Sequence, residues 1–279
     1  MSRYEKLFAA LEAKGEGAFV PFIMLSDPDP DSAVEIISTI VEAGADAVEL
    51  GVPFSDPIAD GPTIQNSHVR ALDGGATVDG ALGQIRRIRA AYPDLPIGML
   101  IYSNVPYVRG LEKFYREFQE AGADSVLLPD VPVREGRPFA EAAETVGVDP
   151  IFIAPAQASE ATLSGVAARS KGYIYAVSRH GVTGTEQESE TTGLADVVAN
   201  IQRFGGAPAL LGFGISSPRH VADAVAAGAA GALSGSAITK IIDKYVEGEH
   251  PNPGRVTDMA ALKKELTEFV SAMKAATKK

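Results

Sequence analysis

One phrase of sequence recurs three times along this chain. EAGADAVELG (42–51), EAGADSVLLP (120–129) and AAGAAGALSG (226–235) each combine a helix end, a glycine suited to a left-handed helix cap, and a short apolar run. The recurrence predicts one helix-to-strand unit that is used repeatedly. It restricts the possible folds strongly, because strands that alternate with helices assemble into a parallel sheet.

Further apolar runs of strand length lie between these joints. The runs are AFVPFIML (18–25), IGMLIY (97–102), PIFIA (150–154), YIYAV (173–177) and ALLGF (209–213). Pro21 counts against a central position for the first run, because proline has no N–H to donate to a ladder. In the joint at 42–51, Val48 and Leu50 flank Glu49 at period two, which predicts that Glu49 points to the opposite face of the strand.

Helical patterns alternate with these runs. A leading helix is expected over 3–14, and a second helix from Asp31 to Gly44. Apolar residues spaced i, i+3, i+4, i+7 predict further helices near 111–118, 139–146, 194–201 and 238–245, and a closing helix near 257–275.

The tally is about eight buried strands, each followed by a helix, in 279 residues. A (β/α)8 barrel typically needs roughly 250 residues. We therefore predict an α/β fold: a single (β/α)8 TIM barrel domain over 1–279, with a leading N-terminal helix and a closing C-terminal helix. A doubly wound open sheet is the alternative, and no G-x-G-x-x-G follows the first strand to support it.

Composition excludes several classes of protein. The chain is 46% hydrophobic and 22% charged, as in ordinary soluble domains, and it contains no cysteine, which excludes disulfides and thiolate sites. Neither a leader sequence nor an apolar run approaching 18 residues is found, so we expect a cytoplasmic protein without a membrane span. The net charge of −11 argues against nucleic acid as a partner.

The segment 46–62 concentrates acidic residues on a stiff loop. It holds four carboxylates and three prolines but no lysine or arginine, which suggests a catalytic role for Glu49 and Asp60. Two structural alternatives stay open: Asp60 could be the N-cap of a helix that begins near Pro62, and Glu49 could pair with a distant arginine.

In a (β/α)8 barrel the active site lies where the strands end. The residues at these positions are largely apolar and aromatic, which favours a flat, hydrophobic substrate part, although plain barrel core is the alternative. They are Phe22, Glu49, Asp60, Leu100, Tyr102, Ile153, Tyr175, Phe213 and Ser234.

The last two strand-end loops suggest a phosphate site. GFGISSP (212–218) and SGSAITKII (234–242) are rich in glycine and serine, and the second opens a helix at Gly235 or Ser236. Nearby cations are few, namely Arg219 and Lys240, so backbone amides and hydroxyls would hold the anion. The alternative is that these residues only form tight turns and a helix cap.

The remaining polar segments restrict the chemistry. The loop 178–193 has no apolar periodicity, and we favour a lid over a passive disordered loop. The four histidines are scattered without ligand spacing, so no metal site is expected, and no lysine ends a strand where a Schiff base would form. Acid–base catalysis by carboxylates on a flat, phosphate-bearing substrate remains.

With these motifs in view, the chain resembles the α subunit of tryptophan synthase. The matching segments are VELGVPFSDPIADGPTIQ (48–65), DSVLLPDVPV (124–133), GVTG (181–184), GFGIS (212–216) and SGSAI (234–238). The resemblance implies a lyase without a cofactor of its own that cleaves indole-3-glycerol phosphate into indole and glyceraldehyde 3-phosphate. It also implies that indole passes to a separate β subunit, which uses pyridoxal phosphate, within an αββα complex.

Two other functions stay open: a stand-alone lyase that releases indole, and a subunit that mainly activates its partner.

The resemblance also assigns roles by position. Glu49 and Asp60 match the catalytic acids, Tyr175 the active-site tyrosine, Thr183 a lid threonine that engages Asp60, and Asp56 the rim on which the partner docks. The substrate-binding set is Phe22, Leu100, Tyr102, Ile153 and Phe213 for the indole pocket, with Gly184, Gly214, Gly235 and Ser236 for the phosphate cradle. The chain departs from the family pattern at Ser26, Pro129 and His180, where glycine or another small residue is usual.

Overall fold

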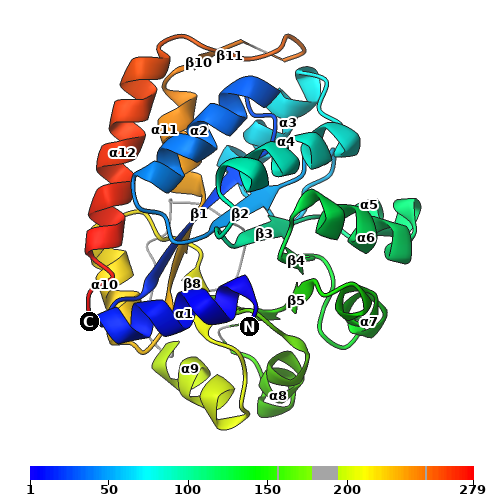
Figure 1. Cartoon of the computed structure of the whole chain (residues 1–279), viewed down its shortest axis with the longest axis vertical. Coiled ribbons are helices and arrows are strands. Elements are labelled where there is room, and N and C mark those ends of the chain that lie inside the picture. Colours follow the sequence, from blue (N-terminus) through cyan, green and yellow to red (C-terminus); the bar gives the residue numbers. More distant parts are fainter. Residues whose placement is uncertain (156, 178–193, 249) are drawn as a thin grey trace.

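A parallel sheet forms the centre of the molecule (Figure 1). The structure, a computed structural model, describes residues 1–155, 157–177, 194–248 and 250–279, and in these residues the sheet has nine strands in the order β5-β4-β3-β2-β1-β9-β8-β7-β6. The strands are β1 (Ala18–Met24), β2 (Val48–Gly51), β3 (Ile97–Leu100), β4 (Ser125–Leu127), β5 (Asp149–Ile151), β6 (Ile153–Ala154), β7 (Ile174–Val177), β8 (Ala209–Gly212) and β9 (Gly231–Ser234).

The two edges of this sheet are joined by the chain itself. Strands β5 and β6 are separated only by Phe152; β5 pairs with β4, and β6 pairs with β7. The single predicted run 150–154 therefore connects the two edges of the sheet. Because β5 and β6 are two parts of this one run, the nine strands occupy eight positions in the barrel. The predicted (β/α)8 barrel is confirmed, and the alternative of an open doubly wound sheet is wrong.

Helices surround the barrel (Figure 1). They are α1 (Arg3–Lys14), α2 (Pro30–Glu42), α3 (Pro62–Asp73), α4 (Val78–Ala91), α5 (Asn104–Arg109), α6 (Leu111–Ala121), α7 (Arg137–Thr145), α8 (Glu160–Arg169), α9 (Leu194–Arg203), α10 (Pro218–Ala226), α11 (Ser236–Asp243) and α12 (Met259–Ala275). A short antiparallel hairpin, β10 (Val246–Glu247) with β11 (Arg255–Val256), separates α11 from α12. The leading and closing helices are confirmed, while the helix expected over 238–245 ends earlier, at Asp243.

None of the helices within the described residues is both long and apolar enough to cross a membrane.

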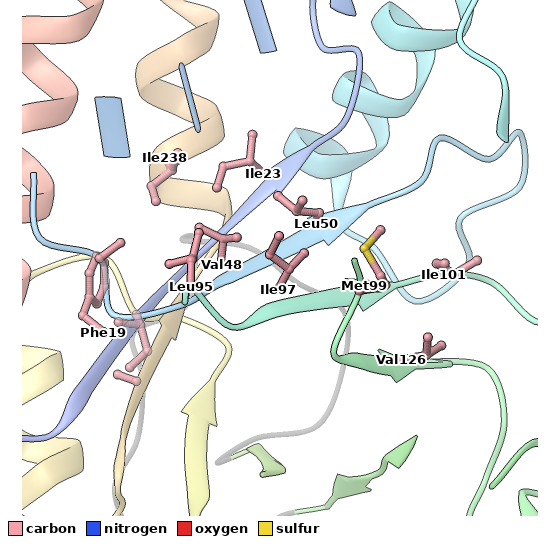
Figure 2. Close-up of a cluster of buried hydrophobic side chains, with 14 of the residues drawn as sticks. Phe19, Ile23, Val48, Leu50, Leu95, Ile97, Met99, Ile101, Val126 and Ile238 are labelled. Atoms are coloured by element: carbon pink, nitrogen blue, oxygen red, sulfur yellow. The ribbon is translucent and has the colours of Figure 1, made fainter. Parts of the chain in front are cut away.

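The outward faces of the strands form the larger apolar core. Figure 2 shows Val48 and Leu50 of β2 together with Ile97 and Met99 of β3, and Ile238 of α11 facing β1. Burying a side chain of this kind stabilises the fold by roughly 1.5–3 kcal/mol. This packing forces the residue between Val48 and Leu50 into the barrel interior, as period two predicts.

Helix α1 closes the end of the barrel at which the strands begin. Ser2 caps the helix, and Tyr4 inserts its side chain into the interior, where its hydroxyl lies 3.0 Å from Ser125 Oγ and its ring lies 5.4 Å from the ring of Tyr173. Because this end is plugged by buried side chains, the opposite end, where the strands finish, is the one that can hold a substrate.

Pro21 occupies a central strand, contrary to the expectation from proline chemistry. Residues 18–21 of β1 pair with β9, whereas residues 22–24 pair with β2. Pro21 is therefore the last residue of β1 in register with β9, and it directly precedes the first residue in register with β2.

Candidate active site

Glu49 projects from β2 into the barrel interior and is almost fully buried, with 1% of its surface exposed. The Tyr173 hydroxyl donates a hydrogen bond of 2.7 Å to its Oε1 atom. Burial raises the pKa of Glu49 to about 7; the Tyr173 hydrogen bond lowers it, and the charge of Asp60 raises it further. Glu49 can therefore give or take a proton near neutral pH. Among the described residues, no arginine forms an ion pair with it, so the structure does not support the ion-pair alternative.

Asp60 lies near the end of the rim loop, which we define as residues 52–61 between β2 and α3. Its Oδ2 atom accepts a 2.7 Å hydrogen bond from the Tyr102 hydroxyl and lies 3.3 Å from His68 Nε2. The Gln65 side chain donates to the Asp60 backbone carbonyl at 2.7 Å. The N-cap of α3 is Gly61, so the alternative role of Asp60 as a helix cap is wrong.

Glu49 and Asp60 line one pocket at the carboxyl end of the barrel. It contains about 470 Å³ of space between protein atoms, counting its open mouth. Its lining is Phe22, Glu49, Asp60, Ile64, Leu100, Tyr175, Phe213, Gly214, Ile215, Leu233, Gly235 and Ser236. The apolar walls and the two carboxylates suit a flat hydrophobic group with a polar edge.

Tyr175 lies between the two carboxylates and the end of β8. Burial, together with the negative charges of Glu49 and Asp60, raises the pKa of Tyr175 far above its usual value, so its hydroxyl stays protonated. A Cβ atom on Gly212 would lie 2.2 Å from the Tyr175 ring, so only glycine leaves room for the ring there. Phe213 then packs edge-on against it, with 6.0 Å between ring centroids.

The other end of the pocket is made of backbone. Phe213 and Gly214 both have positive φ angles (68° and 72°), and this conformation is strained for phenylalanine. Ser234 Oγ donates to the Ile215 carbonyl at 2.7 Å, which fixes the loop against β9. The N-cap of α11 is Gly235, whose lack of a side chain leaves the first amides of the helix available to an anion.

Most of the predicted site residues are brought together, although their roles stay predictions. Tyr102 contacts Asp60 instead of lining the pocket, and Ile153 is half-buried beside Tyr175 in the sheet, outside the pocket lining. Asp56 is exposed on the rim loop. Thr183, Gly184 and the predicted lid 178–193 lie outside the described residues.

The departure at Ser26 has a local explanation. Ser26 has a φ of 63°, a conformation usual for glycine, and its side chain is buried. Its N–H donates to Gln84 Oε1 at 3.0 Å, and Gln84 Nε2 donates to its hydroxyl at 2.7 Å. The two hydrogen bonds offset the strain and satisfy the buried polar groups.

Sequence reasoning missed five residues of the site. Tyr173 could have been found, because it lies two positions before Tyr175 and shares its face. Three pocket-lining residues are not the last residue of any strand, so a search restricted to strand ends does not find them. They are Ile64, Ile215 and Leu233. His68 seemed merely scattered, and no sequence spacing reveals its contact with Asp60.

Within the described ranges, no three histidine, aspartate or glutamate side chains gather in a way that could hold a metal ion.

Comparison with known proteins gives consistent findings. The sequence profile of a family described as "Tryptophan synthase alpha chain" matches residues 8–277. Tryptophan synthase alpha chains of Corynebacterium efficiens and Vibrio parahaemolyticus are 74% and 53% identical to this chain, each over 279 residues and the full length of both proteins.

Solved structures show the same fold. Tryptophan synthase subunit alpha from Legionella pneumophila superposes with a TM-score of 0.85 at 28% identity, covering 99% of this chain and 98% of the other. A chain from the Mycobacterium tuberculosis tryptophan synthase structure gives a TM-score of 0.86 at 26% identity, covering 100% and 99%.

Proposed function

The chain belongs to the tryptophan synthase alpha chain family, and we propose that its pocket cleaves indole-3-glycerol phosphate into indole and D-glyceraldehyde 3-phosphate, a step of tryptophan biosynthesis. One observation carries the assignment of roles: a buried carboxyl, Glu49, has a pKa of about 7 and shares an apolar pocket with a second carboxyl, Asp60. Tuned carboxyl pairs of this kind are typical of acid–base catalysis.

The proposed reaction begins with proton transfer from Glu49 to C3 of the indole ring. Protonation at C3 converts the ring into an indolenine, whose C=N bond accepts the electron pair when the adjacent C–C bond breaks. The substrate thus supplies its own electron sink. The hydroxyl on the neighbouring carbon loses its proton, for which ionised Glu49 is the available base, and becomes the aldehyde of glyceraldehyde 3-phosphate.

Asp60 has the complementary task. The indole N1–H becomes more acidic as positive charge grows on the ring, and a carboxylate held beside it stabilises that charge. The hydrogen bonds from Tyr102 and His68 fix the Asp60 carboxylate before the substrate arrives, which reduces the cost of reorganisation.

The backbone end of the pocket suits the phosphate group. Gly214, Gly235 and Ser236 offer amides and a hydroxyl, and α11 directs its positive end toward them. Arg219 is exposed and lies 3.6 Å from Asp223, so it is not aimed into the pocket as a dedicated counter-charge. By resemblance, Gly184 would add a further amide and Thr183 would close over Asp60.

Exposed apolar side chains at the rim of the barrel favour the proposal that a partner subunit binds there. Ile58 on the rim loop is 75% exposed, and Tyr107 and Val108 of α5 are 78% and 86% exposed. The two segments meet at Tyr102, which accepts a hydrogen bond from the Ala59 amide. Such a surface beside an active site typically binds another protein. We propose that Asp56 and this rim dock a tryptophan synthase β subunit, which receives the indole in an αββα assembly.

We also propose that the chain acts as one domain in the cytoplasm, where a biosynthetic enzyme of this kind would meet its substrate.

The test is a lyase assay on purified full-length protein. Formation of glyceraldehyde 3-phosphate from indole-3-glycerol phosphate is followed through a coupled dehydrogenase, with and without a β subunit. We expect the Glu49→Gln variant to fold and to lose about 10² to 10⁴ in turnover. Glu120→Gln on the exposed face of α6 is the matched control, and it should keep wild-type turnover.

The same assay separates the alternatives. High turnover that a β subunit leaves unchanged would indicate a stand-alone lyase. Lyase turnover that stays close to the background rate with and without a β subunit, combined with strong activation of the β-subunit reaction, would indicate an activating subunit. Near-normal turnover in a folded Glu49→Gln variant would reject the proposed acid.

A further inference from the structure

We propose that His68 is a positioning residue that ties the orientation of Asp60 to the backbone of the rim loop. The inference rests on the proposed function, because it assigns a role in the same reaction. His68 is carried by α3, is 1% exposed and does not line the pocket, so it acts through Asp60 and not on the substrate.

The tautomer of His68 follows from its hydrogen bonds. The Phe54 amide donates to Nδ1 at 2.9 Å, so this nitrogen carries a lone pair. A neutral imidazole then bears its proton on Nε2, which lies 3.3 Å from Asp60 Oδ2 and donates to it. One ring therefore links a backbone amide of the rim loop to the carboxylate.

Tyr102 makes a second link of the same kind. Its hydroxyl accepts from the Ala59 amide at 3.0 Å and donates to Asp60 Oδ2 at 2.7 Å. Its ring also stacks on Phe54, with centroids 5.2 Å apart. His68 and Tyr102 therefore each donate to Asp60 Oδ2 and each hold one amide of the rim loop, Phe54 near its start and Ala59 near its end.

Because of this arrangement, the position of the rim-loop backbone and the orientation of the Asp60 carboxylate depend on each other. If Phe54 and Ala59 shift, both donors to the carboxylate are disturbed at once. The loop also carries the exposed Ile58 and Asp56, so anything that binds the rim changes how firmly Asp60 is held. His68 is the better place to test this link, because Tyr102 also stacks its ring on Phe54, so that changing it disturbs the rim loop in a second way.

Two substitutions separate the two hydrogen bonds of His68, and a third serves as the control. Asparagine places an amide oxygen near the Nδ1 position, so His68→Asn keeps an acceptor for Phe54 but cannot reach Asp60. Glutamine places its amide near the Nε2 position, so His68→Gln keeps a donor to Asp60 but loses the Phe54 link. His250→Gln, at an exposed histidine paired with Asp73, is the matched control.

The two His68 variants should differ in kcat and in their activation by a β subunit. We expect His68→Asn to lower the kcat of the isolated chain about tenfold, with little change in KM, because a hydrogen bond to a charged group is lost. His68→Gln should restore kcat to within about threefold of wild type, yet show at most about half of the activation that a β subunit gives the wild type. If both variants match His250→Gln in kcat and in activation, the proposal is wrong.

A spectroscopic measurement decides the linkage without reference to activity. Nitrogen-15 spectra of histidine-labelled protein should show His68 in the Nε2–H tautomer, and hydrogen exchange at the Phe54 amide should be faster in His68→Gln than in His68→Asn. An Nδ1–H tautomer, or equal exchange in the two variants, would overturn the proposal. Wild-type protein that fails to cleave indole-3-glycerol phosphate would instead reject the proposed function, while these spectra still report on His68.

Discussion

Glu49 and Asp60 line the same pocket, but a buried strand carries Glu49 and a loop at the rim carries Asp60. Glu49 projects from a strand deep inside the barrel, where burial raises its pKa to about 7 and one tyrosine hydroxyl donates to it. Asp60 lies near the end of the rim loop, and Tyr102 and His68 both donate to a single oxygen of its carboxylate. The contrast teaches that two similar carboxyl groups acquire different roles from their surroundings, one as a proton donor and the other as a fixed negative charge.

The largest expected effect tests the buried side of this contrast through stability. Glu49 has its pKa raised from 4.5 to about 7 on folding, so it favours the folded state below pH 4.5, and that contribution is lost as the pH rises through 7. Glutamine does not titrate. We expect Glu49→Gln to be more stable than wild type by roughly 3 kcal/mol at pH 8.

The measurement is urea unfolding of both proteins between pH 4 and pH 8. The stability difference should grow by roughly 1.4 kcal/mol per pH unit between about pH 5 and pH 7 and then level off. A difference that stays constant across this range would mean that Glu49 is not held in a raised-pKa environment.

The second prediction tests the rim side. Asp60→Asn keeps an acceptor for Tyr102 but removes the negative charge that would stabilise the protonated ring. We expect turnover to fall by about 10², as for the loss of one preorganised electrostatic group. Turnover is compared with Glu49→Gln in the same assay. A larger loss for Asp60→Asn than for Glu49→Gln would reverse the roles assigned to the two groups.

The smallest effect concerns the Tyr173 hydroxyl, which donates to Glu49. Tyr173→Phe removes a hydrogen bond that lowers the pKa of Glu49, so that pKa should rise above its wild-type value by roughly half a unit to one unit. Carbon-13 spectra of glutamate-labelled protein would follow the titration, with Tyr107→Phe at the exposed rim as control. A pKa that falls in Tyr173→Phe would show that the hydroxyl stabilises the neutral acid.

Local sequence rules predicted the features that depend on short-range geometry. The period-two pattern around Glu49 placed its side chain inside the barrel, because outward packing of Val48 and Leu50 leaves only one direction for it. The recurring helix-to-strand joints predicted the barrel for a similar reason. The glycines and serines of the last two loops indicated the end of the pocket that Gly214, Gly235 and Ser236 line.

Features that depend on how a loop folds back were beyond such rules. The contact between His68 of α3 and the Phe54 amide depends on the path of the rim loop, and no local sequence pattern indicates that path. Aspartate is a residue type that often caps helices, and Asp60 lies just before α3. The adjacent Gly61 is the N-cap instead, which leaves the Asp60 carboxylate to face the pocket. Ile153 is expected at a strand end, but it begins β6 beside the break at Phe152, away from the lining.

The insertion of Tyr4 into the barrel has a consequence for how the chain is assembled on the ribosome. Helix α1 is synthesised first, but the surfaces that receive Tyr4 come from Ser125 and Tyr173, which emerge much later. The first helix can therefore find its place only after β4 and the residue preceding β7 have left the exit tunnel, and until then its apolar face stays exposed to water. A change in α1 thus reaches Glu49 through the contact of Tyr4 with Tyr173, even though the helix lies at the end of the barrel opposite to the pocket.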